Sequence, residues 1–144
     1  MKKIIVFTIC AVSLLFTVPS HGFAADMTAD QYVKDARAVI KAVSIQDVKK
    51  MLDAKEAVVL LDVRDKNELG DGGIPGALNI SRGTLEFKAP MMLPDKNARV
   101  VVYCGLDLRS PLATKTMTEM GYKNTFNMTG GLKAWKEAGY AIEK

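Results

Sequence analysis

Two short runs of apolar residues constrain the fold of this chain more than any other feature. One runs from Ala57 to Leu61, and the other from Val100 to Tyr103. Neither run alternates apolar with polar residues, so each is typical of a strand that is buried on both faces of a parallel sheet. Because parallel strands need long crossover connections, which are usually helices, the chain is expected to alternate strands with helices.

The segments between these runs have the patterns that such a fold requires. Thr28, Ser44 and Ser110 are predicted helix N-caps, the last followed by Pro111 in the first helical position, and Gly121 is predicted to stop the third helix. We therefore expect an α/β domain with a mainly parallel sheet. The predicted helices are 27–43, 44–55, 110–121 and 131–139, and the predicted strands are 57–61, 77–80, 99–104 and 125–130.

The first 24 residues have the pattern of a secretory signal peptide. Lys2 and Lys3 precede an apolar run over 4–18, and cleavage is predicted after Ala24, with Ala25 as the second choice. A helix of 15 residues would span about 22 Å, less than the ~30 Å of a hydrocarbon core, so export is favoured over an uncleaved membrane anchor. The predicted organisation is a signal peptide over 1–24, a helical lead-in over 25–42 and the α/β domain over 43–144.

Composition excludes several classes of site from the exported chain. The only histidine, His21, and one of the two cysteines, Cys10, lie within the leader. Without them a single chain has no Cys–His dyad, no Ser–His–Asp triad, no Cys/His metal site and no internal disulfide. Removal of Lys2 and Lys3 leaves 18 Lys and Arg against 16 Asp and Glu, and no basic cluster contains interleaved aromatic residues. Nucleic-acid binding is therefore not expected.

The remaining cysteine, Cys104, directly follows the second apolar run and precedes a predicted helix start at Ser110. Ligands of parallel sheets bind beyond the carboxyl ends of the strands, and a loop that enters a helix can surround an anion with backbone amides. Such a cradle, together with the positive charge of Arg109, would favour the thiolate without any histidine. The ordinary alternative is that Cys104 is a small core residue.

The length of this loop bears on the chemistry. Four residues separate Cys104 from Arg109. We interpret this spacing as suited to a small anion or to one extra sulfur atom held as a persulfide, whereas a tetrahedral phosphate ester would need a longer loop. A phosphatase is the less favoured alternative.

Four stretches resemble the rhodanese family of single-domain sulfurtransferases, in the same order. They are "LLDVRDKNEL" from residue 60, "GGIPGALNI" from residue 72, "YCGLDLRSPLATKTMTEMGY" from residue 103 and "NMTGGLKAWKEAGY" from residue 127. The resemblance covers about 43–144. It implies a three-layer α/β sandwich with a mainly parallel sheet of about five strands flanked by helices.

The resemblance also implies an activity and a site. Cys104 would take a sulfane sulfur from thiosulfate or polysulfide, hold it as a persulfide and pass it to a thiol or to cyanide, with no metal or organic cofactor. Together with the leader, it implies a periplasmic enzyme. Asp62 would be a structural residue near the site, and Arg64 is either a site residue or an ion-pair partner of a neighbouring aspartate. The other expected substrate-binding residues are Gly105, Leu106, Asp107, Leu108, Arg109, Ser110 and Arg82.

Two positions depart from the family pattern. Gly73 replaces a histidine, and Asp107 replaces a glycine of the loop. Aspartate can adopt the left-handed conformation, but a carboxylate ~5 Å from an anion would repel it by about 3 kcal/mol at an effective dielectric of ~20. Leu106 and Leu108 also make the loop rim apolar, which favours a donor other than free thiosulfate or a docking partner. A module that binds sulfide, polysulfide or a protein without turnover therefore remains an alternative.

Overall fold

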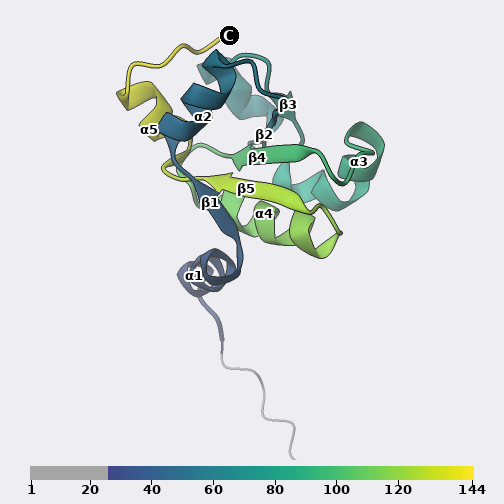
Figure 1. The fold of residues 1–144 in the computed structure, drawn as a ribbon. Helices are drawn as coiled ribbons and strands as arrows, with labels where there is room; N and C mark the ends of the chain where they lie inside the picture. The colour runs from purple at the N-terminus through teal and green to yellow at the C-terminus, as the bar shows by residue number, and fades with distance from the viewer. Residues whose placement is uncertain (1–25) are drawn as a thin grey trace, which may run out of the picture.

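The computed structural model describes residues 26–144 (Figure 1). The predicted signal peptide, its cleavage site, Cys10 and His21 lie outside the described residues. Within 26–144 no helix has both the length and the apolar character needed to cross a membrane.

Five parallel strands form one sheet in the order β1-β5-β4-β2-β3. This arrangement confirms the predicted α/β fold with a parallel sheet of five strands. The strands are β1 (Lys41–Val43), β2 (Val59–Asp62), β3 (Leu78–Asn79), β4 (Arg99–Tyr103) and β5 (Asn124–Met128).

Helices cover both faces of the sheet and complete a three-layer sandwich (Figure 1). Helices α2 and α5 pack on one face, and α3 and α4 pack on the other. The α-helices are α1 (Ala29–Val39), α2 (Ile45–Asp53), α3 (Leu85–Met92), α4 (Arg109–Glu119) and α5 (Gly131–Glu137), and two 3-10 helices are η1 (Lys66–Asp71) and η2 (Arg82–Thr84).

The central position of β4 explains why its sequence does not alternate apolar with polar residues. Val100 and Val102 belong to the core under α3 and α4, whereas Val101 and Tyr103 belong to the core under α2 and α5. All four are fully buried, so both faces of the strand need apolar side chains.

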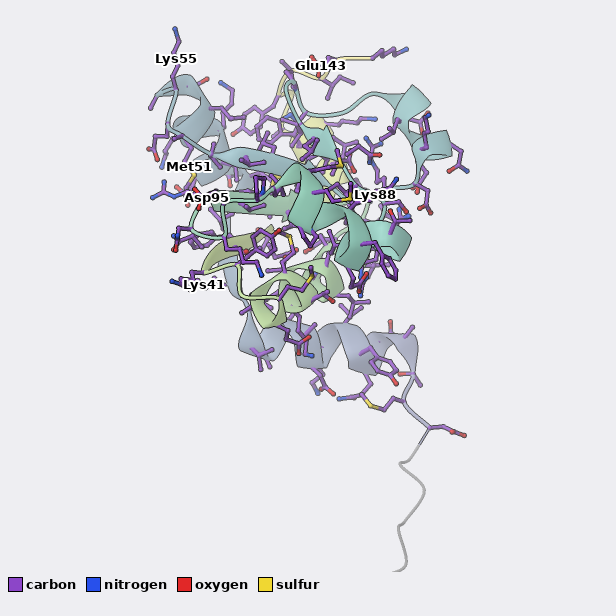
Figure 2. All side chains as sticks on the ribbon, turned by 90° about the vertical axis from the view of Figure 1, so that its right-hand side faces the viewer. Lys41, Met51, Lys55, Lys88, Asp95 and Glu143 are labelled. Atoms are coloured by element: carbon purple, nitrogen blue, oxygen red, sulfur yellow. The ribbon has the colours of Figure 1, made fainter. Side chains whose placement is uncertain are left out.

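The predicted lead-in is wrong in one respect, because the first helix does not continue to Val43. It ends at Val39, and Lys41–Val43 form the edge strand β1, which pairs with β5. Hydrogen bonds of the sheet therefore hold residues that the helical pattern alone assigned to a helix. Helix α1 itself packs against α4, on the outer side of that layer (Figures 1 and 2).

The predicted helix caps are confirmed at two of three positions. The hydroxyl groups of Thr28 and Ser44 accept hydrogen bonds from the third residue after each of them. Ser110 is not an N-cap, because α4 begins one residue earlier, with Leu108 in the N-cap position. The Ser110 side chain is instead buried at the start of α4, where it faces Cys104.

Candidate active site

Cys104 follows β4 at the carboxyl end of the sheet and points to the same side as Val102, towards α4. Its side chain is 1% exposed, and its Sγ donates to Ser110 Oγ at 3.5 Å. The thiol therefore fits both interpretations of the sequence, a small core residue and a thiol beside a helix start. It is buried with the core of that layer, and it lies directly against the first turn of a helix, where an anion is favoured.

Three carbonyl groups of the loop over 104–108 accept hydrogen bonds from helices α5 and α1. Cys104 O accepts from Leu132 N at 2.8 Å, and Gly105 O accepts from Lys133 N at 3.0 Å, both from the start of α5. Asp107 O accepts from Nη2 of Arg37 at 2.6 Å. In a planar trans peptide the following N–H points away from the carbonyl, so the amides of Gly105 and Leu106 point away from α5 and the amide of Leu108 points away from Arg37.

Those amides have no hydrogen-bond partner among the described residues. Among residues 26–144, the N–H groups of 105–108 donate to no protein acceptor, although they lie beside a buried sulfur. Groups of donors left unpaired around one point form an anion-binding concavity. The amides of 105–108 are thus free to bind an anion, and the amide cradle of Gly105, Leu106, Asp107 and Leu108 stays a prediction.

Gly131 allows α5 to approach the loop this closely. It has φ +62°, and an added Cβ would lie 2.7 Å from Cys104 O and 2.8 Å from Asp107 N. Both neighbours are backbone atoms, so a side chain at residue 131 would displace the loop. Gly131, the first residue of α5, therefore lets the helix pack directly against the loop.

Asp107 occupies the centre of the loop with φ +60° and is 6% exposed. Its carboxylate accepts hydrogen bonds from Asn127 Nδ2 at 2.9 Å, Gly130 N at 3.0 Å and Ser110 Oγ at 3.3 Å. Its Oδ2 also forms an ion pair with Arg37 Nη2 at 2.8 Å. The expected repulsion by a bare carboxylate is therefore offset, because the charge of Asp107 is paired and its oxygens are hydrogen-bonded.

Arg109 lies at the end of the loop as predicted, but its guanidinium is held by a residue that the sequence did not identify. Nη1 and Nη2 donate to the two carboxylate oxygens of Glu68 at 2.7 Å each. These hydrogen bonds lower the pKa of Glu68 to about 2 and raise the pKa of Arg109. The only signal for Glu68 was an acidic residue shortly after a strand end.

Arg64 forms the ion pair with a neighbouring aspartate that one of its two interpretations predicted. Arg64 is 3% exposed, and its Nη2 lies 2.6 Å from Asp62 Oδ2. Its remaining donors are used by the carbonyl groups of Glu68 and Gly72. Arg64 still borders the loop, since its Cδ lies 3.9 Å from the position of a Cβ on Gly105. The pair fixes the end of β2 beside the cradle.

The side chain of Arg82 is held by two residues outside the cysteine loop. Its guanidinium donates to Glu86 at 2.8 Å and to Thr116 Oγ1 at 3.0 Å. Thr116 is six residues beyond Ser110, or about 9 Å along α4. The side chain of Arg82 thus packs along α4, and its predicted role in binding the substrate anion stays a prediction.

The outer side of the loop is apolar, as predicted, with Leu106 62% and Leu108 51% exposed. A hollow of about 290 Å³ lies beside Gly105, lined also by Lys133 and Lys136 of α5. No cluster of three potential metal-binding side chains of His, Cys, Asp or Glu occurs within 26–144.

The comparisons with known proteins agree with this geometry. Residues 44–138 match the family model described as "Rhodanese-like domain". The chain is 33% identical over 98 residues to "Thiosulfate sulfurtransferase GlpE" of Pseudoalteromonas translucida, a match that covers 68% of this chain and 90% of that protein.

Two solved structures are similar over most of their length. A Rhodopseudomonas palustris protein, described as of unknown function and "Possible Tyrosine Phosphatase", has a TM-score of 0.76 at 32% identity and covers 84% of this chain and 98% of its own. The polysulfide-sulfur transferase homodimer of Wolinella succinogenes has a TM-score of 0.64 at 35% identity and covers 77% and 83%.

Proposed function

The chain belongs to the rhodanese family, and on that premise we propose that it transfers a sulfane sulfur from thiosulfate or polysulfide to a thiol or to cyanide through a persulfide on Cys104. One observation supports this more than any other. The buried sulfur lies beneath a loop whose amides at 105–108 have no acceptor among the described residues. Family members named sulfurtransferases place rhodanese-type sulfur transfer on this fold.

The proposed reaction has two displacement steps. The Cys104 thiolate attacks the outer sulfur of thiosulfate, the new S–S bond forms, and the bond to the sulfonate sulfur breaks so that sulfite leaves with the electron pair. Cyanide or a thiolate then attacks the terminal sulfur and releases the Cys104 thiolate. In both steps the terminal sulfur is anionic, and the loop amides would stabilise that charge without reorganising.

Ser110 has a defined part in this proposal. Its hydroxyl accepts from the thiol of Cys104 and donates to Asp107 Oδ1. A hydroxyl can rotate, so the same group can donate to the sulfur once the sulfur is ionised. No histidine is needed at this step, since the first turn of α4 and Arg109 supply positive potential.

The experiment compares the protein with its Cys104→Ser variant. Each is incubated with thiosulfate and, separately, with polysulfide; intact mass is measured; cyanide is then added and thiocyanate is assayed. Gain of one sulfur atom in the wild type alone, followed by catalytic thiocyanate formation, supports the proposal. No gain of sulfur from either donor would overturn it.

The same experiment separates the two alternatives. Uptake of sulfur with no release to cyanide or thiols would indicate a binding module. Hydrolysis of an aryl phosphate without sulfur uptake would indicate a phosphatase, the activity named for the Rhodopseudomonas palustris protein. The loop disfavours the phosphatase, because only four residues separate Cys104 from Arg109, where α4 already begins.

We propose further that the protein acts in the periplasm after removal of residues 1–24. The charged start, the apolar run and Ala24 support cleavage. N-terminal sequencing of protein recovered from the periplasmic fraction tests this, and it should begin at Ala25. A full-length chain that stays with the membrane fraction would instead indicate an uncleaved anchor.

A further inference from the structure

We propose that Arg37 of helix α1 is a positioning residue of the active site, which acts on Cys104 through Asp107. This inference rests on the proposed function, since it assigns Arg37 a part in the same sulfur chemistry. It also assigns a role to α1, which lies before the residues that match the family model, 44–138.

Arg37 contacts the loop at two points with one nitrogen. Nη2 lies 2.6 Å from the backbone oxygen of Asp107 and 2.8 Å from its Oδ2. The first contact fixes the peptide between Asp107 and Leu108, so that the N–H of Leu108 points away from α1. The second contact neutralises a carboxylate that is 9% exposed.

The charge of Asp107 is close enough to matter to the thiol. Ser110 Oγ lies 3.5 Å from the sulfur and 3.3 Å from Asp107 Oδ1, so the sulfur and that oxygen are within about 7 Å of each other. Without Arg37, this carboxylate would be negative, nearly buried and next to a second developing anion. Like charges at that distance oppose ionisation of the thiol.

The pairing follows from the residue at position 107. The family pattern has glycine there, which brings neither a charge nor a side chain into the loop. Asp107 keeps the left-handed backbone, and its carboxylate takes the donors of Asn127 and Gly130. Those donors are neutral and leave the negative charge of Asp107 without an opposite charge. Arg37 of helix α1 supplies that charge. Asp107 and Arg37 therefore act as one unit.

Two other ion pairs near the cysteine loop do not involve Asp107. Arg109, at the start of α4, is paired with Glu68 of η1. The Asp62–Arg64 pair lies beyond Gly105 and is closed on itself. Among residues 26–144, Arg37 is thus the cation that forms an ion pair with Asp107.

The test measures the rate at which iodoacetamide alkylates Cys104 from pH 5 to pH 9. We expect Arg37→Met to slow alkylation at neutral pH by about tenfold and to move the profile towards higher pH, because an uncompensated charge within about 7 Å at an effective dielectric of ~20 disfavours the thiolate by at least that factor before screening. Lys34→Met is the matched control: it removes one positive charge from an exposed position of the same helix. It should leave the profile unchanged.

A double variant distinguishes positioning from simple docking of α1. In an Asp107→Gly background, Arg37→Met should no longer change the alkylation profile, and Arg37→Lys in the wild-type background should recover part of the rate. Urea unfolding checks that each variant is folded. A wild-type profile for folded Arg37→Met, or an equal loss of rate in the Asp107→Gly background, would overturn the inference. Alkylation needs no sulfur donor, so these outcomes can be read even if thiocyanate is never formed.

Discussion

Glu68 and Arg109 are joined by two parallel hydrogen bonds of 2.7 Å, which tie the 3-10 helix η1 to the first residue of α4. This pair crosses 41 positions of the sequence and closes one side of the cysteine loop. Arg109 is therefore oriented by a carboxylate at the helix start that follows the cysteine loop.

We expect Glu68→Gln to lower the free energy of unfolding by about 1 kcal/mol at neutral pH, a modest value because a third of each side chain is exposed. The hydrogen bonds from Arg109 lower the pKa of Glu68 from 4.5 to about 2. A lowered folded-state pKa stabilises the fold above pH 4.5, and this contribution is lost as the pH falls towards 2. Urea unfolding of both proteins should show a difference that shrinks over this range; a difference that grows on acidification would contradict the assignment.

Arg64→Met should be much more destabilising than Arg82→Met, although each removes one positive charge. Asp62 would be left buried without its partner, which costs about 3–5 kcal/mol. Arg82 makes an exposed pair with Glu86, worth less than about 1 kcal/mol. Urea denaturation measures both values. Arg82→Met should also keep the wild-type KM for thiosulfate, and a KM raised several-fold would restore Arg82 to the site.

Gly131→Ala and Gly139→Ala form a second matched pair, since both glycines have positive φ, +62° and +72°. An alanine at 139 meets no atom within 4 Å and should cost only the backbone strain, about 1–2 kcal/mol. An alanine at 131 would collide with the carbonyl of Cys104 and the amide of Asp107. We therefore expect a larger loss of stability for Gly131→Ala and a fall in sulfur transfer by about tenfold or more, as misplaced catalytic groups produce. Equal thiocyanate rates for the two variants would show that α5 does not support the loop.

Burial of Cys104 predicts selectivity among thiol reagents by size. The thiol is 1% exposed, so a bulky aromatic disulfide must wait for the loop to open, whereas iodoacetamide needs a smaller movement. The protection factor is the rate of reaction of Cys104 in urea-unfolded protein divided by its rate in the native protein. This factor should be at least about tenfold larger for the bulky disulfide than for iodoacetamide. Equal protection against both reagents would show that the sulfur is reached only by global unfolding.

Much of this molecule could be predicted from local patterns. The runs over 57–61 and 100–103 indicated strands buried on both faces, and Thr28 and Ser44 marked helix starts, because periodicity and capping act over a few neighbouring residues. The position of Cys104 at a strand end before a helix follows from the same patterns. Local patterns failed at residues 41–43, where pairing with β5 overrode the helical pattern.

The sequence by itself determined the two strands buried on both faces, the loop of four residues after Cys104 and the aspartate within that loop. Only the tertiary structure decided which polar side chains meet: Arg37 with Asp107, Glu68 with Arg109 and Arg82 with Thr116. These partners lie 34 to 70 positions apart in the chain. Long polar side chains have many partners of equal local merit, and the layers that pack the apolar residues fix which of them come within reach.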